Sequence, residues 1–244
     1  AFKSYQEIMT DVMSLPSAFT LDNIKNVFHD MKYPATFLNT LIATVIGTLG
    51  IIVIASMGGY KMARVKTRYS RFCFLFCIAP MMIPFQSFML TLVNVATTLH
   101  INGKIWGLAI IYWGLGAPMS IFLYQGFAKG IPLELEESAL IDGCNQFQLF
   151  TRIIFPMLKS CTATVTIINV MWIWNDFLLP LLMLGGRKSS KTLQLAAYSF
   201  MGQYKMEWQN IMSAAILIII PALILYLIFQ KSIIKGVVAG AVKG

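Results

Sequence analysis

Long apolar runs separated by short polar segments dominate the pattern of this chain. A helix needs roughly 20 mostly apolar residues to cross about 30 Å of hydrocarbon. Five runs meet that length, and they cover about residues 36–60, 72–93, 105–126, 160–184 and 210–230. None of them alternates apolar and polar positions, which excludes a porin-type barrel. The pattern therefore predicts an all-α membrane protein, a polytopic transmembrane helix bundle with five spans in this chain.

Glycines and prolines inside the runs agree with a helix bundle in a bilayer. Gly47 and Gly50 lie in the first run, where small residues let neighbouring helices approach closely. Prolines are tolerated in such helices because neighbouring groups can satisfy the freed carbonyls. The runs contain Pro80, Pro84, Pro118, Pro180 and Pro221.

Basic residues indicate which loops face the cytosol. The loop after the first run carries five of them and no acid: Lys61, Arg64, Lys66, Arg68 and Arg71. By the positive-inside rule this loop is cytoplasmic, and alternation then places residues 127–159 and the tail after residue 230 on the same side. Residues 1–35 become an external segment, with a short helix expected to start near Leu21.

An external N-terminus without a signal sequence would be unusual for a membrane protein. We therefore expect a further helix upstream of Ala1, which would give the full-length subunit six spans.

Composition supports the membrane assignment. The chain is 57% hydrophobic and only 12% charged, whereas a soluble domain carries about a quarter charged residues. The net charge of +9 could indicate a nucleic-acid partner. The basic residues lie between apolar runs rather than along one stripe, so we expect no nucleic acid.

No residue set suggests catalysis, a nucleotide site or a metal site. Cys73 and Cys77 are four residues apart, but the two histidines lie far away in sequence, so we expect free thiols. The stretch "GGRKSSKT", residues 185–192, lacks the second glycine of a phosphate-binding loop and falls in an expected external loop. The energy source of any transport must then be another subunit.

The most polar interior stretch of the chain is residues 132–158. Pro132 suits the first turn of a helix, Gly143 can end it with positive φ, and Asn145 with Gln148 forms a capping box for a second helix. Four of the ten carboxylates of the chain fall in it: Glu134, Glu136, Glu137 and Asp142. We expect a cytoplasmic helix-turn-helix. It either rests on lipid or docks a protein partner, and the acids favour the partner because the cytoplasmic leaflet is itself anionic.

Within this stretch, "EESALIDGCNQFQLFTRIIFP" resembles the EAA loop of ABC importer permeases. The matching positions keep the spacing of that motif: Glu137, Ser138, Ala139, Gly143, Ile153, Phe155 and Pro156. Ser138 and Phe155 are mild departures from it. The segments "NTLIATVIGTL", "WNDFLLPLLML" and "GVVAGAVKG" are similar to the smaller permease subunit of the carbohydrate-uptake, maltose-type branch. The resemblance runs from about residue 15 to the C-terminus.

The resemblance implies that residues 36–244 form an ABC permease transmembrane domain, multi-pass in the inner (cytoplasmic) membrane, with residues 127–159 as its coupling loop. The subunit would belong to an ATP-driven, binding-protein-dependent importer of sugars or oligosaccharides. Its partners would be a second permease subunit, two cytoplasmic ATPase subunits, an external solute-binding protein, the carbohydrate and the lipid bilayer. The chain would not be an enzyme and would bind no cofactor, since ATP and Mg would be bound by the ATPase subunits.

The residues expected to couple to the ATPase are Glu134, Leu135, Glu136, Glu137, Ser138, Ala139, Leu140, Asp142 and Gly143. Leu135, Ala139 and Leu140 are the expected apolar anchors.

Asp176 is an ionisable residue inside an apolar run, which usually marks a transport pathway or a buried partner. Aromatic rings stack on sugars, and amide and carboxylate groups bond their hydroxyls. The candidate substrate-path residues are Trp172, Trp174, Asn175 and Asp176. The other interpretation is an aromatic belt near the outer headgroups.

Two alternatives to a sugar importer remain. One is an ABC permease for a non-sugar solute. The other is a stand-alone ion-driven secondary transporter, which should show internal repeats and several ionisable residues at the midplane. This chain has one candidate, Asp176, and no internal repeat that we detect.

Overall fold

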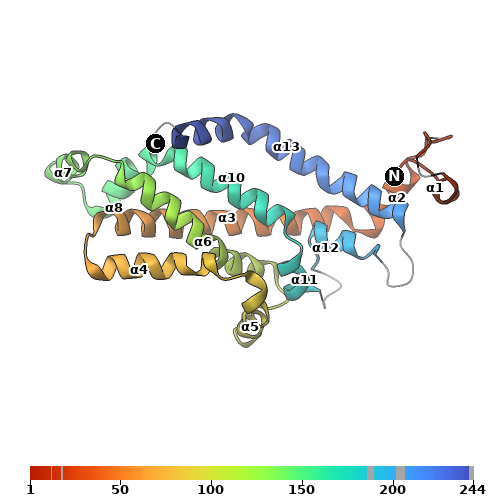
Figure 1. Cartoon of the computed structure of the whole chain (residues 1–244), viewed down its shortest axis with the longest axis horizontal. Coiled ribbons are helices and arrows are strands. Elements are labelled where there is room, and N and C mark those ends of the chain that lie inside the picture. Colours follow the sequence, from red (N-terminus) through yellow and green to blue (C-terminus); the bar gives the residue numbers. More distant parts are fainter. Residues whose placement is uncertain (12, 18, 186–189, 202–206, 242–244) are drawn as a thin grey trace.

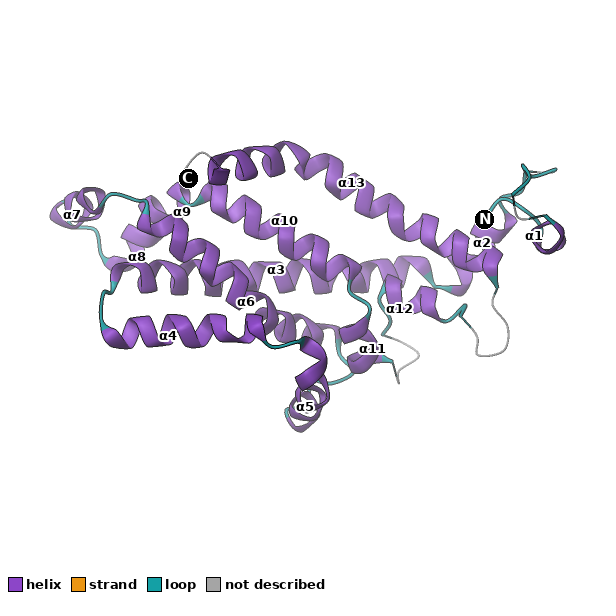
Figure 2. Ribbon diagram, in the orientation of Figure 1, coloured by secondary structure: helices purple, strands orange, loops and turns teal. Residues whose placement is uncertain are grey.

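The computed structural model describes residues 1–244 apart from 12, 18, 186–189, 202–206 and 242–244. The described chain is an elongated bundle of helices joined by turns (Figures 1 and 2). The all-helical fold predicted from the apolar runs is thereby confirmed.

Two long helices form the centre of the bundle, α3 (Tyr33–Arg64) and α6 (Ile105–Lys129). Both are long and apolar enough to cross a membrane. They make the most extensive helix pair among the described residues, and the expected runs 36–60 and 105–126 lie within them. Close approach explains this packing: a Cβ on Gly59 would lie 2.7 Å from the Cβ of Tyr124. Trp113 likewise occupies the space beside Gly50, which confirms close approach at that glycine.

The run expected as a span over residues 72–93 is a broken helix. It consists of α4 (Arg68–Ile78), a 3₁₀ turn η1 (Ala79–Met82) and α5 (Phe85–Thr98), with a bend of 107° between the helices on either side of Ile83 and Pro84. Proline has no N–H for the helical ladder and pushes the preceding residue into extended backbone, and Ile83 has ψ 121°. Pro84 therefore breaks the run rather than kinking it, and the predicted span becomes a pair of bent helices.

The run 160–184 is also divided. α10 (Lys159–Asn175) ends at Asp176, whose backbone is extended, and α11 (Leu178–Leu184) follows. The Asp176 Oδ1 accepts a hydrogen bond of 3.1 Å from the backbone N–H of Leu178, so the carboxylate serves the start of the second helix.

The C-terminal run lies in α13 (Trp208–Ala241), which contains Pro221. Within the described side chains its apolar part extends from Trp208 to Ile224. Two helices of the described chain thus satisfy the length and hydropathy of a span, or up to four if each bent pair counts as one. The described helices therefore establish two to four spans, and they do not establish the predicted number of five spans.

Short helices cover the ends of the bundle. α1 (Tyr5–Thr10) and α2 (Asp22–Asp30) precede α3, and the start of α2 beside Leu21 confirms the expected helix there. α12 (Leu193–Tyr198) is fixed to α3 by a 2.9 Å hydrogen bond from the Leu193 N–H to the Thr40 Oγ1.

The turn between α3 and α4 lies at the same end of the bundle as α7 (Leu133–Ile141) and α8 (Gln146–Gln148). α1, α2 and α12 lie towards the opposite end (Figure 1). The basic loop and the acidic stretch, which the charge pattern placed on one side of the membrane, therefore share one end of the molecule.

Candidate functional site: an exposed helix held by the end of α3

The helix α7 projects at the end of the bundle (Figure 1). Pro132 precedes its first turn with φ −57° and ψ 139°, and acidic residues follow where the helix dipole favours negative charge. Its C-terminus is a Schellman motif. The Cys144 N–H donates to the Ala139 carbonyl at 3.0 Å and the Gly143 N–H to the Leu140 carbonyl at 3.1 Å. Gly143 has φ +84°, so the prediction that it ends the helix in the left-handed region is confirmed.

The second helix starts as the sequence predicted. The Gln148 N–H donates to the Asn145 Oδ1 at 2.8 Å, and the Asn145 N–H donates to the Gln148 Oε1 at 3.0 Å. This is the reciprocal capping box. After α8 the backbone passes through a π turn, η2 (Leu149–Ile154), and α9 (Phe155–Met157), and it then bends by 75° into α10.

One face of α7 is buried against the bundle and the other is exposed. Glu136 and Ala139 are the buried residues, at 8% and 5% exposure. Leu135, Leu140 and Ile141 lie on the exposed face, and Ile141 is 86% exposed. The remaining expected coupling residues are also exposed: Glu134, Glu137, Ser138, Asp142 and Gly143. The structure thus places Ala139, expected as an anchor for a partner, on the inward face beside Glu136.

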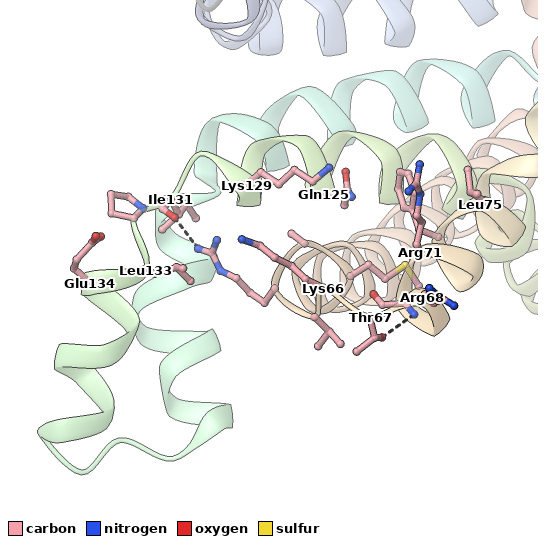
Figure 3. Close-up of a pocket in the computed structure, with 17 residues that line it drawn as sticks. Lys66, Thr67, Arg68, Arg71, Leu75, Gln125, Lys129, Ile131, Leu133 and Glu134 are labelled. Carbon is pink, nitrogen blue, oxygen red and sulfur yellow. Dashed lines mark hydrogen bonds between the residues drawn. The ribbon is translucent and has the colours of Figure 1, made fainter.

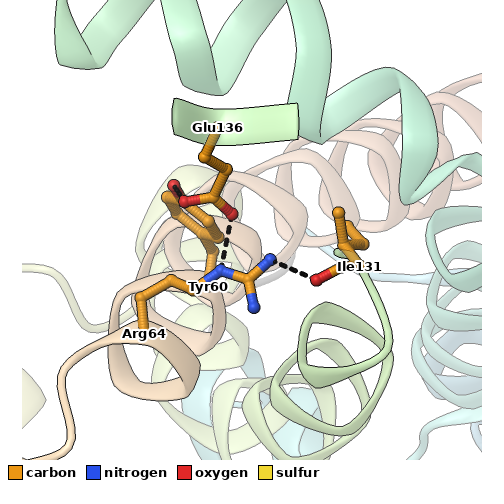
Figure 4. A network of polar contacts seen from close by, with 4 residues as sticks. All are labelled: Tyr60, Arg64, Ile131 and Glu136. Atoms are coloured by element: carbon orange, nitrogen blue, oxygen red, sulfur yellow. Dashed lines mark hydrogen bonds and ion pairs between the residues drawn. The ribbon is translucent and has the colours of Figure 1, made fainter. Parts of the chain in front are cut away.

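Glu136 is the centre of a buried polar network (Figure 4). Its Oε1 accepts from the Arg64 Nε at 2.5 Å, and its Oε2 accepts from the Tyr60 hydroxyl at 2.8 Å. The Arg64 Nη2 also donates to the Ile131 carbonyl at 2.8 Å. The Arg64 and Glu136 side chains are 14% and 11% exposed. The network joins the exposed helix to the last turn of α3 and to the turn before Pro132.

Sequence reasoning missed this network. Arg64 was interpreted only as a topology signal, and Tyr60 was not singled out. One signal was available, since a basic loop and an acidic helix were both predicted on one side of the membrane. The sequence could not show which basic residue would contact which acidic residue, because Arg64 and Glu136 are 72 positions apart and are brought together only by helix packing.

Aromatic packing anchors the second half of the loop to the same helix. The Phe150 ring lies 5.7 Å from the Tyr60 ring and 5.9 Å from the Phe155 ring. Leu149 and Ile154 are buried in the main hydrophobic core. A displacement of either half of the loop would therefore act on α3 as well as on α10.

A large cavity lies beside the network (Figure 3). Its volume is about 1030 Å³, and it opens between the α3–α4 turn and the α6–α7 turn. Its charged lining residues are Arg64, Lys66, Arg68, Arg71, Lys129 and Glu134.

A second cavity, of about 350 Å³, lies where the broken helices meet, and Trp172 and Asp176 line it. The Tyr112 hydroxyl donates to the Asp176 Oδ2 at 2.7 Å. The Tyr112 ring packs edge-on against Trp172 with 5.3 Å between ring centres. A carboxylate and an indole therefore share one cavity, as the substrate-path interpretation requires.

The other two candidates lie elsewhere. Trp174 is 1% exposed and packs in a separate hydrophobic cluster, edge-on to Phe37 at 5.8 Å. Asn175 is exposed, and its Nδ2 donates to the Met171 carbonyl at 2.8 Å. The structure thus brings together two of the four expected residues and separates the rest.

Cys73, Cys77, Cys144 and Cys161 are free thiols. Within the described ranges no group of three or more His, Cys, Asp or Glu side chains could hold a metal ion. Of the glycine- and lysine-containing stretch at 185–192, residues 186–189 lie outside the described residues.

Comparison with known families defines the class of the protein. Residues 48–238 match the family described as binding-protein-dependent transport system inner membrane component. The chain belongs to this family. Its members are transport components rather than enzymes, and membership implies a solute-binding protein and ATPase subunits as partners.

Individual relatives cover nearly the whole chain. It is 39% identical over 243 residues to the probable starch degradation products transport system permease protein AmyC of Thermoanaerobacterium thermosulfurigenes, covering 100% of this chain and 88% of that protein. It is 37% identical to the multiple sugar-binding transport system permease protein MsmG of Streptococcus mutans, again covering 100% and 88%. Among solved structures, a bacterial ABC transporter involved in the import of the acidic polysaccharide alginate matches with TM-score 0.78 and 21% identity, covering 94% of this chain and 86% of that one. That match supports the fold.

Proposed function

We propose that this chain is one permease subunit of an ATP-driven importer for sugars or oligosaccharides. The family supplies the binding-protein-dependent transport role. The names of several relatives supply the substrate class, including the melibiose/raffinose/stachyose import permease protein MelC of Bacillus subtilis, which is 32% identical over 94% of this chain. A second permease subunit and two ATPase subunits would complete the complex.

We also propose the arrangement in the membrane. Residues 36–244 form the permease domain with five spans, at about residues 36–60, 72–93, 105–126, 160–184 and 210–230. The bent pair α4–α5 is the second of them, and α10 with α11 is the fourth. Residues 1–35 lie outside, and residues 127–159 form the cytoplasmic coupling loop. Exposed apolar side chains along the bundle, such as Leu49, Val53 and Phe76, suit contact with lipid or with the second permease.

The observation that carries the mechanism is α7, an exposed helix held to α3 through Glu136, Arg64 and Tyr60. Its outer face, with Leu135 and Leu140, would enter a groove on the ATPase. Its inner face, with Ala139 and Glu136, would transmit the movement. When ATP closes the ATPase dimer, α7 moves with it. The buried contacts then pull the end of α3, and the spans switch from inward-facing to outward-facing.

The cavity at Asp176 is our candidate for part of the substrate path. Its carboxylate would accept hydrogen bonds from sugar hydroxyls, and Trp172 would stack on an apolar sugar face. The broken helices around it support this placement, because irregular backbone at membrane depth is tolerated where it lines a cavity.

The decisive experiment is reconstitution of the complete complex in proteoliposomes with its binding protein. We expect one class of sugar or oligosaccharide to stimulate ATP hydrolysis and to accumulate inside. If only non-sugar solutes stimulate hydrolysis, the permease role stands and the substrate class is wrong. Uptake driven by an ion gradient without ATP would overturn the assignment entirely.

A further inference from the structure

The cavity beside α7 carries an unusual charge balance. Its lining contains five cationic side chains and one carboxylate, which is that of Glu134. Arg64 is already engaged with Glu136. In the described part of the chain the only other ion pair is His29–Asp30, on α2. Four cations therefore face this cavity without a carboxylate partner: Lys66, Arg68, Arg71 and Lys129.

In the proposed topology these cations lie at the headgroup level of the membrane. Arg64 is the last residue of α3 and Lys129 the last of α6, the two helices that are each long enough to span. Arg68 is the first residue of α4. Basic pockets between transmembrane helices on the cytoplasmic side are sites where acidic lipid headgroups bind.

An apolar surface continues from the cavity along α4. Phe74 and Leu75 line the cavity, and Leu75 is 53% exposed. Tyr69, Phe72 and Phe76 on the same helix are 77%, 65% and 71% exposed. A ligand with a charged head and long hydrocarbon chains could use both parts. A free phosphate ion would contact only the cationic part, and it would leave most of the 1030 Å³ cavity unfilled.

We propose that this cavity binds the phosphate headgroup of an anionic phospholipid whose acyl chains run along α4. The proposal rests on the proposed placement of this end of the bundle at the cytosolic membrane surface, but not on the identity of the transported solute. Figure 3 shows Lys66, Arg71 and Lys129 around the space between the end of α6 and the α3–α4 turn.

The site has a consequence for coupling. Arg64 and Ile131 belong both to the cavity lining and to the network that holds α7. A bound lipid phosphate would place a second anion beside the Arg64–Glu136 pair and would limit the movement of the α6–α7 turn. The lipid would therefore alter how well ATP hydrolysis is coupled to transport.

The test compares two triple variants of the complete complex, purified from membranes in mild detergent. Lys66→Gln/Arg68→Gln/Arg71→Gln removes three cavity cations. Lys61→Gln/Arg152→Gln/Lys159→Gln removes three exposed cations near the same end that do not line the cavity. Retained phosphatidylglycerol and cardiolipin are quantified by native mass spectrometry, with phosphatidylcholine as the neutral comparison. Each cation near a membrane surface contributes about fivefold to anionic-lipid binding.

We expect the cavity triple to lose at least tenfold in retained anionic lipid and the control triple to lose little. An equal loss of anionic lipid in both triple variants would mean that general surface charge retains the lipid, and it would overturn the proposed site. Displacement of the lipid by inorganic phosphate or glycerol phosphate at similar concentrations would assign the cavity to a free phosphate instead. Loss of the second permease subunit from the cavity triple, with unchanged lipid per complex, would assign the cations to a protein interface. Sugar-stimulated hydrolysis is measured separately, so failure here does not bear on the proposed substrate.

Discussion

At the scale of single residues, Glu136 decides how α7 is attached. Its carboxylate accepts from both Arg64 and Tyr60, and both charged side chains are largely buried. Removing one member of a buried pair leaves the other charge unpaired, which costs about 3–5 kcal/mol, whereas replacing both by apolar residues is often close to neutral.

We therefore predict that Arg64→Met and Glu136→Leu each lower the thermal stability of the complex and its coupled uptake. The double variant should recover most of the stability but not the coupling, because α7 would no longer be held in one position. The measurements are thermal unfolding, basal ATP hydrolysis and uptake. Glu137→Ala, exposed on the same helix, is the control and should change docking by under about 1 kcal/mol. Full coupled uptake in Glu136→Leu would remove the transmission role from this network.

Gly143 sets the angle at which the chain leaves α7. A Cβ added there meets no atom within 4 Å, so the cost of Gly143→Val comes from the backbone at φ +84° and not from a clash. That cost is about 1–2 kcal/mol for a non-glycine residue in the left-handed region. We expect Gly143→Val to insert in the membrane but to pull down less ATPase and to lose coupled uptake. Gly143→Asn should keep most of both, since asparagine tolerates this conformation. Normal uptake in the valine variant would favour a helix pair that rests on lipid.

Asp176 and its neighbour Asn175 give a matched test of the substrate path. Asp176 lines the cavity with Trp172, while Asn175 is exposed and bonds its own helix. A hydrogen bond to a charged group contributes about 1.5–3 kcal/mol, so Asp176→Ala should raise the sugar concentration for half-maximal uptake roughly 10- to 100-fold. Asn175→Ala should leave that concentration nearly unchanged. A similar change in both variants, or none in either, would place the path elsewhere.

At the scale of helices, the pair α3–α6 depends on small residues at the contact. Gly58 and Gly59 are neighbours in sequence but differ in surroundings. A Cβ on Gly59 would press against Tyr124 and the backbone N of Gln125, whereas one on Gly58 would meet nothing within 4 Å. We predict that Gly59→Ala destabilises the complex by about 1–3 kcal/mol through overpacking. Gly58→Ala should be neutral or slightly stabilising, because alanine is the better helix former. The measurement is thermal unfolding of the two variants. Equal stability would mean that α3 and α6 can move apart without loss of stability.

The broken helices show a second property at this scale. The breaks at Ile83–Pro84 and at Asp176 each interrupt a run that hydrophobicity alone would continue as one helix. The two breaks meet at one cavity with Pro80 and Pro118 in its lining. Apolar composition sets the length of a run. The backbone hydrogen bonds that proline removes, or that an aspartate side chain replaces, decide where the helix stops.

At the scale of the whole molecule, the proposed topology makes a direct prediction. Single cysteines are introduced at Lys61 and Ser138, at one end of the bundle, and at Lys25 and Thr98 as expected external positions. The four native cysteines are replaced beforehand. A membrane-impermeant maleimide should label positions 61 and 138 only from the cytosolic side, and positions 25 and 98 only from outside. Labelling of positions 61 and 138 from opposite sides would contradict the shared cytoplasmic end and with it the span count.

Local features of this protein could be determined from the sequence by itself. The apolar runs predicted an all-helical fold, and Gly143, Asn145 and Gln148 predicted the end of one helix and the start of the next. Such signals can be read because capping involves groups within about five residues of each other, so the chain near each residue contains both partners.

Tertiary structure decided the rest. It selected Glu136 rather than Glu137 for the buried face of α7 and gave it Arg64 as a partner. It also separated Trp174 from Trp172, two residues apart on one helix, into a hydrophobic cluster and a cavity. Both outcomes depend on which helices pack together and on how a helix is rotated against its neighbours. A difference of one or two residues turns a side chain by 100° or 200° around the helix axis, so its surroundings are set by partners far away in the sequence.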